Sequence, residues 1–204
     1  GPWPWPRSVM ASLLDRIFTR YAPAAVGLDM VFPPGVPDNE DSALARALNG
    51  RPVVVGQLFT QDSGERGRAS YQTFNTSAGL PQFQGTLASS PRLGVTQAGH
   101  INALIDSDGK MRRLWPAVCA AAGCSPALAV SLFGLLTGTD GWHIERGRPW
   151  QSPWRLAPAS ARELALPLDE NFAAAIPWLP SPPHRYLSAA QIWQGTLPPE
   201  ALQN

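Results

Sequence analysis

The segment AVGLDMVFPPGVPDNEDSALARALNGRPVVVGQLF, residues 25–59, decides the fold. Its two ends, 25–32 and 52–59, are short and almost wholly apolar, a pattern typical of strands buried on both faces. Between them, residues 41–48 have the spacing of a short helix that begins at Asp41. Strand, helix and strand in this order predict a parallel sheet with helical crossovers.

Working outward from this segment, the chain alternates further helices and extended runs. Apolar residues at helical spacing predict a helix over 8–21 that Ser8 caps, and Ser125 and Pro126 are suited to begin another helix over 125–136. Residues 61–92 have no clear period, so we expect a long surface loop with short pieces of structure, held by its aromatic residues. The remaining expected elements are a hairpin over 95–118 turning at Asp108-Gly109, a smaller hairpin over 142–150, a strand over 172–178 and a capped helix over 188–193.

The fold class is therefore α/β, with a mixed sheet that has a parallel core and antiparallel hairpins, flanked by helices. A chain of 204 residues has room for one full core, and we interpret 3–204 as a single domain. Gly1-Pro2 precedes it without an initiator Met, and we interpret this dipeptide as a protease-cleavage scar, with native sequence as the alternative.

Composition excludes several classes of protein. Charged residues make up 15% of the chain and hydrophobic residues 44%, which fits a well-buried domain and argues against disorder. The net charge is +1, so no basic face is available for a nucleic acid partner. No run approaches the roughly 20 apolar residues of a membrane span, and we expect no signal peptide within these residues.

Cys119 and Cys124 lie close together in VCAAAGCSP. They could pair across a short turn in an oxidising compartment, and sequence alone leaves the pairing open. Their spacing is not CxxC, so neither a zinc site nor a redox motif is indicated.

Asp29 is the first candidate for ligand binding, because a carboxylate within an apolar strand is costly unless it is paired. It could contact a ligand or cation at the end of the sheet, or it could be a structural residue bonded to the backbone or to Arg7. Arg7 is itself a candidate ligand-binding residue. Trp5 could stack on a ligand, or it could cover the core where the chain enters the domain.

The Asp-Gly turn supplies the other candidates. Asp106 and Asp108 resemble the start of a calcium loop, but the remaining oxygen ligands are absent and turn chemistry explains both. Arg112 and Arg113 could grip an anion, although neighbours on a strand point to opposite faces, so at most one would serve a given pocket. The alternative is a solvated or internally paired arginine. No nucleophile elbow, phosphate-binding glycine loop or histidine cluster is present, so we expect no catalytic residues, no metal and no cofactor.

Several segments follow one another in a recognisable order: WPWPR at 3–7, GLDMVF at 27–32, DSALARAL at 41–48, PVVVG at 52–56, GHINALIDSDGKMRR at 99–113, and IPW and YLSAAQIWQG near the end. Together they resemble the CHASE2 family of extracytoplasmic sensor domains. The resemblance covers most of the chain but not the middle loop. It implies a strand before Trp3 and another after Asn204, so we expect an open position in the sheet that neighbouring molecules could fill by strand addition.

The resemblance also implies a periplasmic domain of a bacterial inner-membrane receptor, anchored by segments outside this chain. Such a domain would sense an unknown small ligand, ion or partner and relay it to a cytoplasmic cyclase or kinase. The alternative is a module for homodimerisation or for contact with another envelope protein, without a small-molecule ligand.

Overall fold

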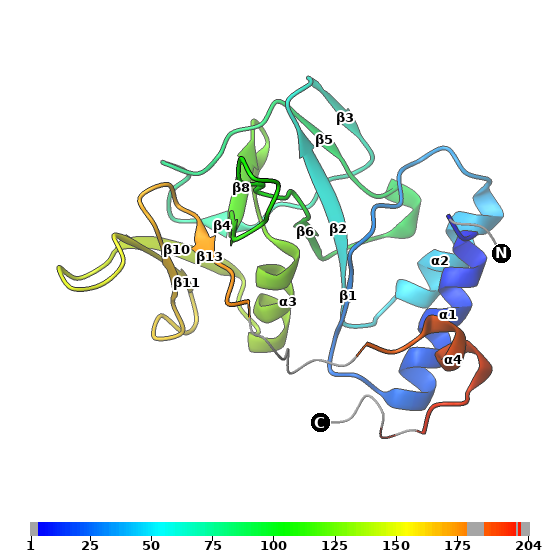
Figure 1. Ribbon diagram of the computed structural model, residues 1–204. Helices are drawn as coiled ribbons and strands as arrows, with labels where there is room; N and C mark the ends of the chain where they lie inside the picture. Colours follow the sequence, from blue (N-terminus) through cyan, green and yellow to red (C-terminus); the bar gives the residue numbers. More distant parts are fainter. Residues whose placement is uncertain (1–3, 179–185, 199, 201–204) are drawn as a thin grey trace.

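A computed structural model describes residues 4–178, 186–198 and 200, so the dipeptide interpreted as a cleavage scar lies outside the described residues. The chain has the predicted mixed α/β architecture in one domain (Figure 1). In the central sheet, β2 is parallel to β1 and β6 and antiparallel to β5, which is parallel to β3. These strands are β1 (Val26–Leu28), β2 (Val53–Thr60), β3 (Gly64–Arg66), β5 (Gly85–Leu87) and β6 (Ala98–His100).

Helices cover both faces of the central sheet (Figure 1). On one face, α1 (Arg7–Tyr21) and α2 (Asp38–Leu48) bury Leu14 and Leu44 against Val55 of β2. On the other face lies α3 (Leu128–Thr137), whose Ser131 hydroxyl donates to the Ala98 carbonyl at 3.1 Å. The short α4 (Ala189–Gln194) packs on α1 through a small apolar cluster around Ile192.

A second sheet and two strand pairs complete the domain beyond α3 (Figure 1). The second sheet has the order β12-β11-β10-β4, and its buried side chains form a second core cluster that includes Trp142 and Leu156. The strand pairs are β7 with β13 and β8 with β9. The bounds are β4 (Thr73–Phe74), β7 (Arg113–Leu114), β8 (Ala117–Ala120), β9 (Gly123–Pro126), β10 (Gly141–Arg146), β11 (Trp154–Pro158), β12 (Leu166–Leu168) and β13 (Ala174–Ala175).

Several predicted elements are confirmed, and others are shorter than expected. The helices over 8–21 and 188–193 are present, and the Ser188 hydroxyl accepts a hydrogen bond from the Ala190 amide as a cap. The hairpin predicted over 142–150 has a longer connection, because β10 pairs with β11 at 154–158. The late strand over 172–178 is reduced to β13. The first run of the 95–118 hairpin contributes β6, which joins β2 rather than β7.

Two helix caps were predicted wrongly. Ser125 lies in β9 opposite Val118, and α3 begins only after Ala127. The buried Ser125 hydroxyl instead accepts a hydrogen bond from the Gln57 side chain at 2.7 Å. Ser8 does not cap α1, whose N-cap residue is Pro6.

The 61–92 segment is more structured than the predicted surface loop. It contains β3, β4 and β5 and runs into the short helix η1 (Pro91–Leu93). Thr86 of β5 is buried, and the ring of Phe59 contacts Tyr71 and Phe83 edge-on. Strands of two or three residues are too short to leave a period in the sequence, so the pattern gave no sign of them.

Candidate functional site

Three predicted ligand-binding residues, Trp5, Arg7 and Asp29, line one cavity of 930 Å³. We call it the N-terminal cavity. Its walls are the entry segment before α1, the connection from β1 to α2, and the side chains of Leu58 and Ile101. Its volume is within the range of small-molecule sites, and most of its lining is apolar.

The sequence predicts Asp29 within a strand, and this prediction is wrong. The strand β1 ends at Leu28, and the backbone of Met30 then passes over β2, where it would lie 2.9 Å from a Cβ atom on Gly56. Asp29 is consequently exposed at the end of the strand, and no ion pair involves it within the described part of the chain. A solvated carboxylate needs no structural partner, so Asp29 remains available to a ligand.

Arg7 pairs with Asp41 rather than with Asp29. Both residues are buried, with 6% and 3% of their surface exposed, and a guanidinium nitrogen of Arg7 donates to the Asp41 carboxylate. A second guanidinium nitrogen donates to the Pro33 carbonyl, and the Ser90 hydroxyl donates to Asp41 at 2.7 Å. We call these four residues the Arg7 cluster. Burial lowers the pKa of Arg7, and the nearby charge of Glu40 opposes that shift.

Glu40 makes a second connection between the two helices. The amide and the hydroxyl of Ser8 donate to its carboxylate at 2.8 and 3.0 Å, and these bonds lower the pKa of Glu40. The first turn of α1 is therefore fixed to the first turn of α2 beside the cavity. Arg7 uses two guanidinium nitrogens to bind Asp41 and the Pro33 carbonyl, so it holds the wall of the cavity in place. Asp29 is the exposed charge on the rim.

Sequence reasoning missed Asp41, Ser90 and Glu40. The sequence predicts Asp41 at the start of a helix, but the helix begins at Asp38. A signal was present, because Asp41 lies three and seven residues before Leu44 and Leu48, on the face that the helix buries. Nothing in the sequence pattern identifies Ser90 as a partner of that carboxylate.

Asp106, Asp108 and Arg113 belong to a separate cluster at the Asp-Gly turn. Asp106 accepts hydrogen bonds from Arg112 and from Arg113, both at 3.0 Å, and these bonds lower its pKa. Arg112 also binds both carboxylate oxygens of Asp108, at 2.9 and 2.7 Å, which lowers the pKa of Asp108. The expectation that the two arginines face apart is wrong here, since Arg112 precedes β7 and turns back to the same carboxylate.

The arginines therefore occupy the carboxylates that a cation would need. Arg113 also reaches Asp169 at 3.3 Å, so the cluster is internally paired. The described residues include no group of three or more His, Cys, Asp or Glu side chains arranged to hold a metal ion. We assign this cluster a structural part in holding the turn, where Gly109 has a φ of 78°.

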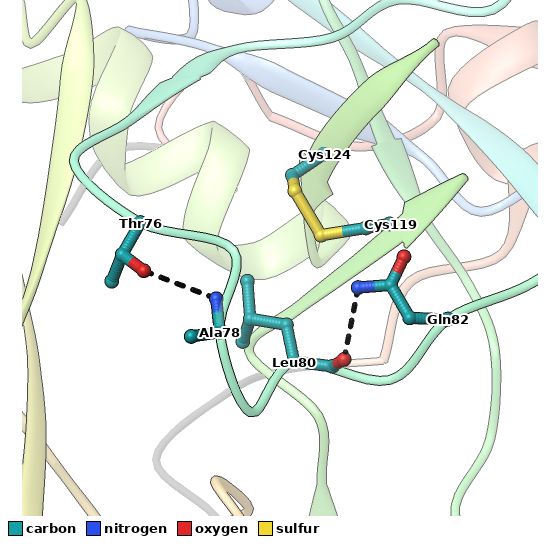
Figure 2. Close-up of a disulfide and its surroundings, with 6 residues drawn as sticks. All are labelled: Thr76, Ala78, Leu80, Gln82, Cys119 and Cys124. Atoms are coloured by element: carbon teal, nitrogen blue, oxygen red, sulfur yellow. Dashed lines mark hydrogen bonds between the residues drawn. A yellow bond between two sulfur atoms is a disulfide. The ribbon is translucent and has the colours of Figure 1, made fainter. Parts of the chain in front are cut away.

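Cys119 and Cys124 form a disulfide between β8 and β9 (Figure 2). They are directly opposite in the antiparallel register, with Cα atoms 4.0 Å apart. Both are buried in the second core cluster beside Leu80, and the Cys119 amide donates to the Pro81 carbonyl at 2.9 Å. A buried disulfide of this kind is typical of proteins in an oxidising compartment.

His100 is buried in β6, with 2% of its surface exposed. Burial lowers its pKa to about 4, and the Trp115 carbonyl opposes this shift only in part. Its Nδ1 atom accepts a hydrogen bond from the Asn102 amide at 3.3 Å. The imidazole is therefore neutral near pH 7 and belongs to the core rather than to the N-terminal cavity.

Comparison with known proteins gives one family. A family model described as the CHASE2 domain matches residues 1–204, the whole chain. No curated protein and no solved structure matches. Among the described residues, no helix has the length and apolarity needed to cross a membrane.

Proposed function

Because the chain belongs to the CHASE2 family, the extracytoplasmic sensory domains of signalling receptors, we propose that its N-terminal cavity is the sensory site. The observation that carries the proposal is the meeting of Trp5, Arg7 and Asp29 around one cavity. These residues come from the entry segment, the first turn of α1 and the end of β1. A small ligand or ion held there would contact the elements that the Arg7 cluster joins.

Signalling requires that the ligand bind two conformations of the domain with different affinity. The Arg7 cluster is a suitable element, because a buried ion pair has few intermediate arrangements between formed and broken. A ligand that contacts Asp29 and the β1–α2 connection would favour one position of α1 over another. The difference in affinity between the two positions sets the size of the shift.

We further propose that the domain lies in the periplasm as part of a bacterial inner-membrane receptor. The output would be a cytoplasmic cyclase or kinase outside this chain, and the domain itself would have no catalytic activity. The Cys119–Cys124 disulfide supports the compartment, since such bonds persist where the surroundings are oxidising.

A thermal-shift screen of small metabolites and metal ions tests the sensory site. A compound present at about 100 times its Kd adds about 2.7 kcal/mol to the free energy of unfolding, which raises the Tm by several degrees. We expect the shift to be lost in Asp29→Asn and in Val36→Trp, which places a large ring in the cavity. It should persist in the matched controls Asp140→Asn and Ile105→Trp, which alter exposed residues outside the cavity.

Equal shifts in all four variants would exclude the N-terminal cavity as the site. No stabilising compound in the screen would count against a small-molecule ligand and in favour of the alternative, a module that acts by self-association or by contact with an envelope protein. Exposed aromatic residues favour that alternative, since 77% of Trp150 and 67% of Trp178 are exposed. Light scattering on the purified domain distinguishes the two modes of this alternative. Self-association makes the measured mass rise with protein concentration, whereas contact with an envelope protein does not.

A further inference from the structure

We propose that a second cavity, between α3 and the strands β11 to β13, binds a small apolar molecule or a single aliphatic chain. We call it the α3 cavity. Its volume is 410 Å³, and it is lined by fourteen residues that all have apolar side chains. It shares no lining residue with the N-terminal cavity, so the proposal stands independently of the sensory site.

The side chains of the lining leave nothing for a polar ligand to bind. The side chain in the wall that could donate a hydrogen bond is Trp142, and its indole N–H already donates to the Gln72 side chain at 2.6 Å. Backbone groups of β11 are used in pairing with β10 and β12, while β12 is the edge strand and pairs on one side. Water in such a space finds few partners, and an apolar cavity of about 150 Å³ already suffices to bind benzene.

The walls are rigid and the mouth is open. Trp142, Leu156 and Ala174 form a buried floor, each at most 3% exposed, and lie on hydrogen-bonded strands. At the mouth, Phe133 of α3 is 38% exposed and Leu164 is 51% exposed. An apolar ligand would cover both side chains, and this burial drives its binding.

The size of the cavity favours a small molecule over a protein partner. Small-molecule sites measure about 300–1,000 Å³, and 410 Å³ falls within that range. A stable protein interface uses about 20–30 residues on each side. The fourteen lining residues of the α3 cavity are fewer than such an interface uses.

Fluorescence titration with N-phenyl-1-naphthylamine, an uncharged apolar probe, tests the proposal. We expect saturable binding at one site, and competition by 1-decanol and decanoate with similar strength, because the site holds the chain and not the head group. Ala129→Phe and Ala165→Phe fill the cavity and should each weaken probe binding about tenfold or more. Ala122→Phe, an exposed residue in the β8–β9 turn, is the matched control and should bind as the wild type does.

A further variant and a vesicle experiment complete the test. Leu164→Glu places a charge at the exposed mouth and should abolish binding while the thermal melting curve stays unchanged. Co-flotation with phosphatidylethanolamine–phosphatidylglycerol vesicles, if lost in Ala129→Phe, identifies a bilayer lipid as the source of the chain. If the wild-type domain binds the probe but does not co-float with the vesicles, the source of the chain is a free ligand.

Two results would overturn the proposal. One is a wild-type domain that shows no saturable probe binding, or cavity-filled variants that bind as tightly as the control. The other is a probe signal that falls as the protein concentration rises, with dimers seen by light scattering, because the face would then be a contact between two copies. Neither result bears on Asp29 or on the N-terminal cavity.

Discussion

Asp41→Ala removes one partner of the buried ion pair and leaves the Arg7 guanidinium without the carboxylate that binds it, with Glu40 as the nearby negative charge. The side chains of Arg7 and Asp41 are only 7% and 4% exposed, so solvent cannot replace the lost carboxylate. Breaking a buried pair in this way costs about 3–5 kcal/mol. We therefore expect the free energy of unfolding to fall by about that amount, and the Tm by about 6–20 °C for a domain of this size.

Equilibrium unfolding in urea measures this cost, and an exposed pair provides the comparison. Asp15→Ala removes the partner of Arg51, where the two side chains are 57% and 27% exposed, and should cost less than about 1 kcal/mol. The double variant Arg7→Met/Asp41→Leu should recover most of the loss, because an apolar pair of similar volume is often neutral. If Asp41→Ala costs no more than Asp15→Ala, the Arg7 cluster does not hold α1 to α2.

Three further predictions concern the core. Gly99→Ala should lower the free energy of unfolding in urea by about 1–3 kcal/mol, because its Cβ would lie 2.6 Å from the α3 backbone. Gly27→Ala, whose nearest neighbour would be at 3.5 Å, should lower it less, and equal losses would contradict the close packing at Gly99. Replacing Cys119 and Cys124 by Ala opens a loop with a sequence separation of 5 and should cost about 2 kcal/mol, and dithiothreitol should lower the wild-type Tm but not that of the double variant. His100 has a folded pKa of about 4, below the 6.5 of the unfolded chain. Its contribution to the free energy of unfolding is therefore complete above pH 6.5 and is lost as the pH falls toward 4, by about 3 kcal/mol in all. In His100→Gln the free energy of unfolding should fall less between pH 7 and pH 4, and parallel profiles would contradict the burial of a neutral imidazole.

The parts of the fold that were predictable are those with strong local signals. The run 52–59 forms β2 because its apolar residues suit a strand covered on both faces, and Ser188 caps α4 because its hydroxyl accepts a hydrogen bond from the Ala190 amide. Ser125 had an equally good capping pattern before an apolar helix. It was drawn into β9 because the disulfide and the pairing with Val118 fix that strand up to Pro126.

Three of the six predicted ligand-binding residues line the N-terminal cavity, the other three lie at the Asp-Gly turn, and the pairing of Arg7 was not predictable. Asp29, Arg7 and Trp5 do surround one cavity, yet the reason given for Asp29 was wrong, since β1 ends before it and leaves it in solvent. Arg7 is 34 residues from Asp41, and no local pattern specifies a contact at that separation. Such a contact depends on how two helices cross, which is set by the packing of their apolar faces.

Helix α1 touches both ends of the described chain. Its first turn lines the N-terminal cavity, while near its other end Arg20 and the Tyr21 hydroxyl donate to the Leu197 carbonyl, beyond α4, at 3.0 and 3.4 Å. Its 15 residues span about 22 Å, so a tilt of about 10° at one end would displace the other by about 4 Å. A displacement of α1 at the N-terminal cavity would therefore also move the segment at Leu197.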